Sequence, residues 1–136
     1  MLIVSSVCYG VVALISVVFG VIYLTRDQFM PYHSLALAKP WTEVEPNIQT
    51  LILALMRVAG GGFLATGIAM IVLLLIPFQA KEPWAIYSIF IIALITALGS
   101  AYGTFLVKSR TPGNPPFKLS LVSVILSATA FICSLV

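Results

Sequence analysis

Charged residues are scarce in this chain. Only 8% of its 136 residues are charged and 61% are hydrophobic, and the mean hydropathy is +1.15. Because soluble domains carry about 25% charged residues, these values exclude an ordinary soluble domain and indicate an integral membrane protein. The net charge of +3 is small and dispersed along the sequence. It therefore gives no indication of nucleic-acid binding.

Long polar stretches are also missing. The longest, residues 25–49, is shorter than the roughly 50 residues that a separate domain needs. Uncharged runs fill most of the rest, at residues 1–25, 58–80, 83–107 and 119–136. Each has the length of about 18 to 20 residues that crosses the hydrocarbon core as a helix. We therefore expect a lipid bilayer as the surroundings and one domain, residues 1–136.

The apolar runs are continuous and do not alternate with polar residues, which excludes a spanning β-barrel. The sequence predicts an all-α transmembrane fold: a four-helix antiparallel bundle with helices at about 2–24, 46–77, 84–107 and 118–136. A short interfacial helix is expected in the first loop. Pro31 suits a first helical position, and Pro40 would end the segment "PYHSLALAK".

Two signals compete at the start of the second long helix. Thr42 and Glu45 have the spacing of a capping box. Glu45 followed by Pro46 instead places proline in the first helical turn. Either signal predicts a helix that begins near residues 43–46 and is longer than the hydrocarbon requires.

Cysteine and histidine are nearly absent, which limits the possible chemistry. The chain has two cysteines, one histidine and no Cys-x-x-Cys, so a disulfide oxidoreductase built on that motif is excluded. We interpret Cys8 and Cys133 as small apolar fillers, with a disulfide as the alternative. A single histidine provides neither a metal cluster nor two haem ligands. We expect no metal, no cofactor and no catalytic residues.

The basic residues of the loops predict an orientation. With four spans, loops 25–49 and 108–118 lie on the same side, and they contain most of the Lys and Arg residues, whereas the opposite connection contains only Lys81. The positive-inside rule places these two loops in the cytoplasm and both termini outside. The residues counted in the two loops are Arg26, Lys39, Lys108, Arg110 and Lys118.

Small residues recur at helical spacing on three of the predicted helices, which permits close helix packing in a membrane. A polar lining for a water-filled path is the alternative interpretation. The residues are Ser6, Gly10, Ala13 and Gly20; Ala93, Ala97 and Ala101 beside Gly99-x-x-x-Gly103; and Ser120, Ser123, Ser127, Ala130 and Ser134.

The candidate binding site centres on Arg57, which follows the apolar run "LILALM". Either the helix tilts and draws Arg57 inward, or the first loop folds over the run and supplies a carboxylate to the guanidinium. The glycines after it indicate a close helix contact or, alternatively, a cavity beside the charge. His33 is interpreted as a residue that fixes the loop. The predicted binding residues are Arg57, Gly60, Gly61, Gly62, His33, Tyr32, Asp27 and Glu43.

The segments "FMPYHSLALAKPW" and "LILALMRVAGGGFLATGIAM" resemble a group of small four-helix bacterial integral membrane proteins of uncharacterised function. The resemblance covers about the first half of the chain. It implies a bacterial inner-membrane location and no particular reaction. The chain departs from small multidrug transporters, because its first helix has no glutamate.

Three functions are compatible with these patterns. The first is a non-enzymatic membrane component, either a homo-oligomer or an accessory part of a larger membrane complex. The second is a carrier or binder of a lipid, quinone or small anion that uses Arg57 beside Gly60–Gly62. An enzyme with His33 and Asp27 or Glu43 as general base ranks last, because no nucleophile or metal cluster accompanies them.

Overall fold

A computed structural model describes all residues, 1–136, and confirms the all-α fold. Four of its helices are long and apolar enough to cross a membrane. The protein is therefore an integral membrane protein. The elements are α1 (Leu2–Thr25), α2 (Pro31–Leu37), the 3-10 helix η1 (Trp41–Glu43), α3 (Pro46–Leu75), α4 (Pro83–Arg110) and α5 (Phe117–Ser134).

Proline sets the start of three helices. Pro31, Pro46 and Pro83 each occupy the first turn of their helix, where the missing N–H costs no hydrogen bond. The second of the competing signals is therefore the one used, with Glu45 as N-cap and Pro46 following it. Thr42 caps nothing and lies within η1.

Three helix ends differ from the expected bounds by two residues or more. α5 ends at Ser134 and not at residue 136. α3 ends at Leu75, two residues before Pro77, because proline disfavours helical conformation in the residue before it. α4 continues past residue 107 to Arg110. Lys108 and Arg110 then lie in its last turn, where cations interact favourably with the helix dipole.

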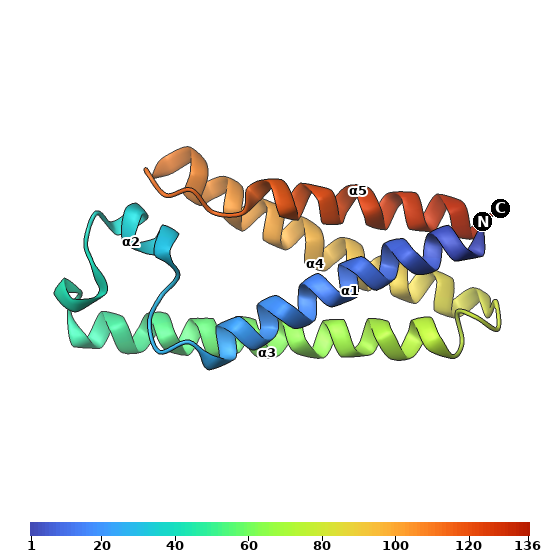
Figure 1. The fold of residues 1–136 in the computed structure, drawn as a ribbon, viewed down its shortest axis with the longest axis horizontal. Coiled ribbons are helices and arrows are strands. Elements are labelled where there is room, and N and C mark those ends of the chain that lie inside the picture. The colour runs from blue at the N-terminus through green and yellow to red at the C-terminus, as the bar shows by residue number, and fades with distance from the viewer.

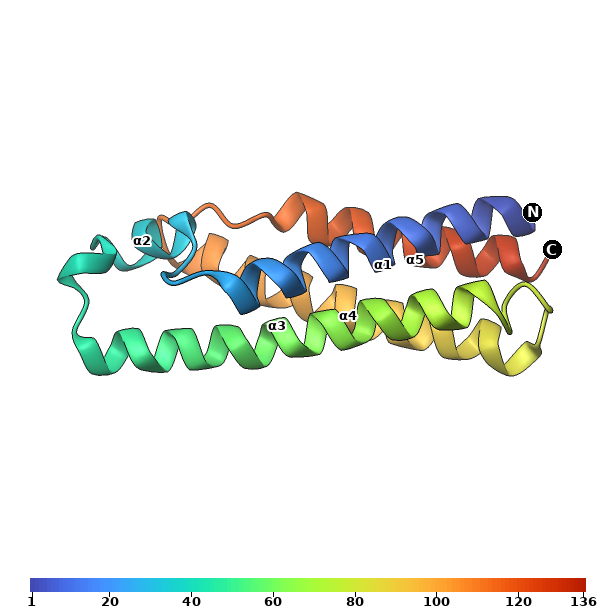
Figure 2. The same cartoon turned by 60° about the horizontal axis from the view of Figure 1, so that its bottom comes forward.

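The helices form two layers that diverge at one end (Figures 1 and 2). α1 crosses the bundle diagonally: it starts beside α5 and ends against α3. Both termini lie at one end, and α2, η1 and the 111–116 segment lie at the other. Loops 25–49 and 108–118 therefore share one end, as the alternation of four spans requires.

Bare glycine backbone brings α1 and α3 into close contact. A Cβ atom at Gly20 would lie 2.6 Å from the backbone nitrogen of Leu64, and one at Gly67 would lie 2.9 Å from the carbonyl oxygen of Ala13. Such distances leave no room for a side chain. The small face expected on the first helix is therefore a packing surface at Ala13 and Gly20.

α4 and α5 pack through the expected small residues. The alanines at 93, 97 and 101 are buried, as are the seam residues Ser120, Ser123, Ser127 and Ala130. Ser123 and Ser127 donate their hydroxyl protons to carbonyls one turn back in α5. Gly99 and Gly103 differ, because a Cβ at either would meet nothing within 4 Å. Their spacing therefore serves no helix contact within this chain.

The first loop folds over part of "LILALM". Phe29, Val44 and Met56 form a small buried cluster, against which Ile52 and Leu53 pack. Phe29 also packs edge-on against Trp41, with 4.8 Å between ring centroids. The loop therefore covers one face of the run. Leu51 and Leu55 stay exposed.

Candidate functional site

Arg57 binds the end of α1. Its Nη1 donates to the carbonyl oxygen of Tyr23 and its Nη2 to that of Arg26, both at 2.7 Å. The expected carboxylate partner is therefore wrong. The last carbonyls of a helix lack intrahelical partners and carry partial negative charge, so they suit a guanidinium at this depth. Arg57 thus caps α1 and joins it to α3.

The three glycines after Arg57 lie in different surroundings. A Cβ at Gly60 would lie 2.9 Å from the Cβ of Tyr23 and 3.0 Å from the carbonyl oxygen of Gly20. Gly60 therefore permits close contact with α1. Gly61 and Gly62 have open space around them, and α3 continues through all three. The glycine run thus makes no bend in α3.

The two acidic residues of the predicted site remain apart from it. Asp27, just after α1, and Glu43, in η1, both have exposed side chains. Neither accepts a hydrogen bond from Arg57, whose guanidinium donates to two backbone carbonyls. They therefore contribute no binding group beside the guanidinium.

His33 holds the start of α2. Its Nδ1 accepts a hydrogen bond of 3.2 Å from the backbone N–H of Met30, in capping-box geometry. Its ring lies 4.3 Å from that of Tyr32, centroid to centroid. Burial lowers the pKa of His33 below its ordinary value. The imidazole is therefore neutral at physiological pH, and no group of three potential ligands could hold a metal ion.

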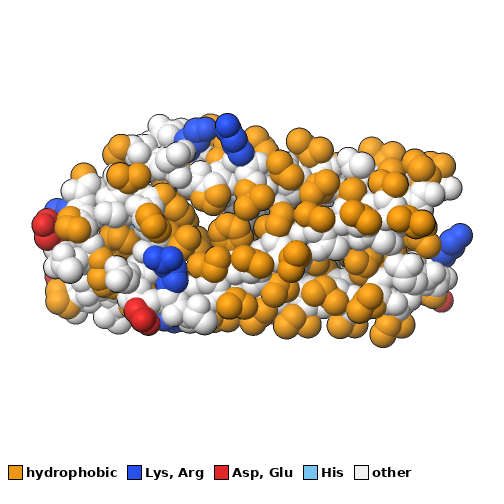
Figure 3. Space-filling model, viewed as in Figure 1, with side chains coloured by type: hydrophobic (Ala, Val, Ile, Leu, Met, Phe, Trp, Pro, Cys, Tyr) orange, Lys and Arg blue, Asp and Glu red, His pale blue; other side chains and the backbone are white.

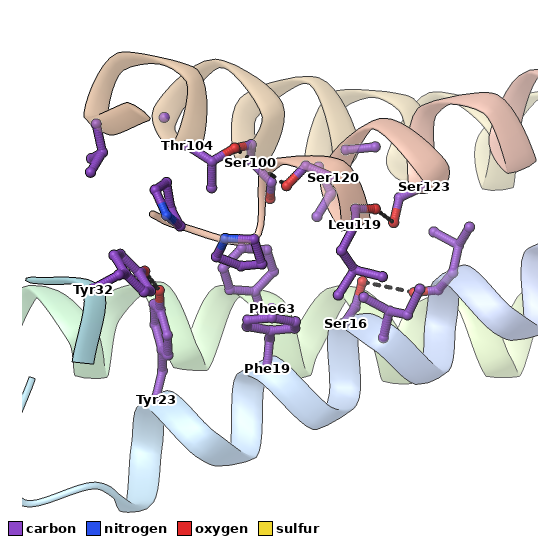
Figure 4. Close-up of a pocket in the computed structure, with 18 of the residues that line it drawn as sticks. Ser16, Phe19, Tyr23, Tyr32, Phe63, Ser100, Thr104, Leu119, Ser120 and Ser123 are labelled. Carbon is purple, nitrogen blue, oxygen red and sulfur yellow. Dashed lines mark hydrogen bonds between the residues drawn. The ribbon is translucent and has the colours of Figure 1, made fainter. Parts of the chain in front are cut away.

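A cavity of about 260 Å³ lies where the two helix layers diverge. Figure 4 shows it between α4 and α5 on one side and α1 and α3 on the other. In Figure 3 the surface is hollowed at this place, toward the end of the bundle that carries α2. Tyr32 and His33 line the cavity; Arg57, Asp27, Glu43 and Gly60–Gly62 do not.

The two sides of the cavity differ in chemistry. One side, which we call the hydroxyl wall, belongs to α4 and α5; the other, the aromatic wall, belongs mainly to α1 and α3 (Figure 4). No charged side chain lines either wall. The hydroxyl wall consists of Thr96, Ser100, Thr104, Ser120 and Ser123, and the aromatic wall of Phe19, Tyr23 and Phe63.

Two tyrosines close the cavity at the α2 end. The hydroxyls of Tyr23 on α1 and Tyr32 on α2 are hydrogen-bonded at 2.7 Å. Burial, followed by this hydrogen bond, raises the pKa of Tyr32 above its ordinary value. Tyr32 is therefore neutral at physiological pH. The short helix α2 is thus fastened to α1 as a cover.

The cover separates the cavity from a second hollow. This groove, of about 400 Å³, runs between α2 and α3 and is lined by Leu37, Ile52 and Leu55 among others. Tyr23 and His33 line both spaces. The two hollows are therefore neighbours on either side of these side chains.

The predicted site missed the hydroxyl wall of α4. Thr96, Ser100 and Thr104 recur every four residues, so they share one face of the helix. That spacing is the signal that would have found them. The serines of α5 were predicted as a packing seam, with the lining of a water-filled path as the alternative. Ser120 and Ser123 line the cavity, whereas Ser127 does not.

Comparisons of this chain with known protein families, with curated proteins and with solved structures found no match. The cavity and its walls are therefore the features of this chain that bear on its function.

Proposed function

We propose that this integral membrane protein is a non-enzymatic binder or carrier of a small, uncharged, lipid-like molecule. The observation that carries the proposal is the cavity of about 260 Å³ with one hydroxyl wall and one aromatic wall. Small-molecule sites are typically about 300 to 1,000 Å³ and mostly apolar with a few polar groups. The cavity is slightly smaller, so it suits a compact molecule or one part of a larger molecule.

Among a lipid, a quinone and a small anion, the anion has the least support. Burying an anion without a paired cation is costly. Arg57, the cation that the sequence offered for this role, already donates to two carbonyls and does not line the cavity. An uncharged ligand needs no such partner.

The test is to fill the cavity and measure what the protein retains. Ser100→Leu places a larger apolar side chain in the hydroxyl wall, and Thr129→Leu makes a matched change at an exposed position of α5. Small molecules extracted from each protein after mild purification from native membranes would be quantified by mass spectrometry. We expect Ser100→Leu to lose a molecule that the wild type and Thr129→Leu both retain.

Two results would contradict the proposal: a wild-type protein that retains no such molecule, or equal retention by all three proteins. Ser100→Val, a smaller filler of the same position, replaces Ser100→Leu if that variant does not assemble. Circular dichroism of each purified variant would establish that the helices are intact.

Self-association, or assembly into a larger membrane complex, is a second candidate. Its support is Gly99, which is exposed on α4 and where a Cβ meets nothing within 4 Å; Gly103, the other glycine of the spacing, lines the cavity. A small residue on an exposed helix face permits close approach of another membrane helix. Gly99→Ile should then abolish a dimer seen by native mass spectrometry in mild detergent. A wild-type chain that is always monomeric, with no copurifying partner, would rule this candidate out.

The location that we propose is a bacterial inner membrane, with loops 25–49 and 108–118 in the cytoplasm and both termini outside. Two features support it: the resemblance in the first half of the chain, and the gathering of Lys and Arg side chains at the α2 end (Figure 3). In a chain with Cys8 and Cys133 replaced by serine, Lys39→Cys should resist a membrane-impermeant maleimide in intact cells. Rapid labelling there would reverse the orientation.

A further inference from the structure

We infer that the cavity recognises a flat, uncharged ring that carries carbonyl oxygens, the chemistry of a lipid-soluble quinone headgroup. This inference rests on the proposed function and adds the class of ligand. Hydroxyl donors, aromatic faces and the size of the cavity each support it.

The hydroxyl wall has protons to donate. A serine or threonine hydroxyl has a single proton. Thr104 gives its proton at 2.7 Å to the carbonyl oxygen of Ser100, and Ser123 gives its proton to that of Leu119. The hydroxyls of Thr96 and Ser100 have no protein partner, whereas that of Ser120 lies 3.5 Å from the hydroxyl of Thr104. Two donors in the wall, Thr96 and Ser100, are therefore free.

Free donors favour an acceptor as the ligand's polar group. A carbonyl oxygen has two lone pairs and no proton, so it can accept from these hydroxyls without a charge being buried. A carboxylate or phosphate would also accept. It would, however, bring a negative charge into a cavity that no cationic side chain lines. A neutral carbonyl is therefore the acceptor that the cavity fits.

The aromatic wall favours a flat ring. Phe19, Tyr23 and Phe63 pack against one another with ring centroids 6.2 to 6.5 Å apart. Ring pairs in offset or edge-to-face contact gain about 0.5 to 1.5 kcal/mol beyond area burial. A flexible acyl chain gains no such directional contact. A planar group between the two walls would meet aromatic rings on one side and hydroxyl donors on the other.

The volume admits a single ring. The cavity measures about 260 Å³, slightly less than the typical 300 to 1,000 Å³ of a small-molecule site. It therefore suits one compact ring. An attached chain would have to leave through the hollow seen in Figure 3, where it would meet the bilayer.

The experiment compares three probes on the full chain in nanodiscs of phosphatidylcholine. The first is a benzoquinone with one isoprenoid unit. The second is the same molecule with methyl groups in place of the carbonyl oxygens, and the third is a monoacylglycerol, which has an ester carbonyl and no ring. Binding is measured as probe retained above empty nanodiscs. We expect the quinone to bind about three- to tenfold more tightly than the methyl analogue, because a carbonyl oxygen accepts a hydrogen bond that a methyl group cannot accept.

Ser100→Ala and Ser127→Ala form a matched pair of serine variants. Ser100 lines the cavity and has a free proton, whereas Ser127 does not line the cavity and donates its proton to the carbonyl oxygen of Ser123. Ser100→Ala should weaken quinone binding about three- to tenfold, and it should leave the methyl analogue unaffected. Ser127→Ala should change both by less than about twofold.

Each contrary result overturns a defined part of the inference. Equal binding of quinone and methyl analogue, or equal effects of the two serine variants, overturns carbonyl recognition. Tighter binding of the monoacylglycerol overturns the flat ring. In both cases the proposed function still stands if the wild type retains a molecule from native membranes that Ser100→Leu loses. Failure of all three probes overturns the inference, and failure of the retention test as well overturns the function.

Discussion

The guanidinium of Arg57 donates a hydrogen bond of 2.7 Å to the carbonyl oxygen of Tyr23, which lies 34 residues earlier in the chain. This bond and its partner to Arg26 tie the end of α1 to the middle of α3. Tyr23 also lines the cavity, and its hydroxyl is hydrogen-bonded to that of Tyr32. Arg57 therefore fixes the end of α1, to which the cover α2 is joined through the Tyr23–Tyr32 hydrogen bond.

Replacing Arg57 should destabilise the bundle without abolishing ligand retention. Arg57→Gln removes two hydrogen bonds from a charged donor, so we expect the free energy of unfolding to fall by about 2 to 4 kcal/mol. Unfolding in mixed detergent micelles would measure it. Arg110→Gln, at the exposed end of α4, is the control. Equal stability of the two variants would show that the cap at α1 is unimportant.

Alanine at Gly60 and at Gly61 should have opposite effects. The Cβ of Gly60→Ala would press on Gly20 and Tyr23 of α1, so we expect a loss of about 1 to 3 kcal/mol. At Gly61 the space is open, and alanine should stabilise α3 by about 0.5 to 1 kcal/mol through its higher helix propensity. Both changes would be measured by the same unfolding assay. A stabilising Gly60→Ala would refute the close contact.

Removing the hydroxyl of Tyr32 should loosen the cover. Tyr32→Phe loses the 2.7 Å bond to Tyr23, which contributes about 0.5 to 1.5 kcal/mol. Backbone amides of α2 should then exchange with deuterium about two- to tenfold faster. Tyr102→Phe, on the exposed side of α4, should leave this exchange unchanged. Protection of α2 that survives Tyr32→Phe would mean that the tyrosine pair does not hold it.

Acid should also weaken the cover, through His33. Burial lowers its pKa in the folded cover, so the unfolded segment binds the proton more readily. The stability that neutral His33 gives to α2 is therefore fully present above its ordinary pKa of about 6.5. This stability is lost as the pH falls from there toward the lowered pKa of the folded state. Protonation at Nδ1 also removes the acceptor for Met30. The protection factors of the α2 amides, which are corrected for the pH dependence of intrinsic exchange, should therefore fall as the pH is lowered below about 6.5.

His33→Gln provides the control for this pH dependence. Glutamine can accept the same backbone N–H at this position of a capping box and does not titrate. The variant should keep α2 protected and lose the change with pH. An unaltered pH dependence in His33→Gln would assign the effect to another group.

Local sequence predicted the covering of the apolar run but not the partner of Arg57. The apolar run "LILALM" predicted that some group covers it, and the first loop does so at Ile52 and Met56. The partner of Arg57 could not be read in the same way. Carboxylates are visible in a sequence, whereas every residue carries a carbonyl, and only a helix end leaves carbonyls free.

The sequence by itself determined the four spans and their starts, because about 20 uncharged residues suffice to cross hydrocarbon and proline is tolerated in a first turn. It also determined which residues are small enough for close packing. Only the tertiary structure decided that α1 leaves α5 and ends on α3, which opens a space walled by residues from separate elements. Such a space depends on the angles between helices, and these follow from the sum of many packing contacts along each helix.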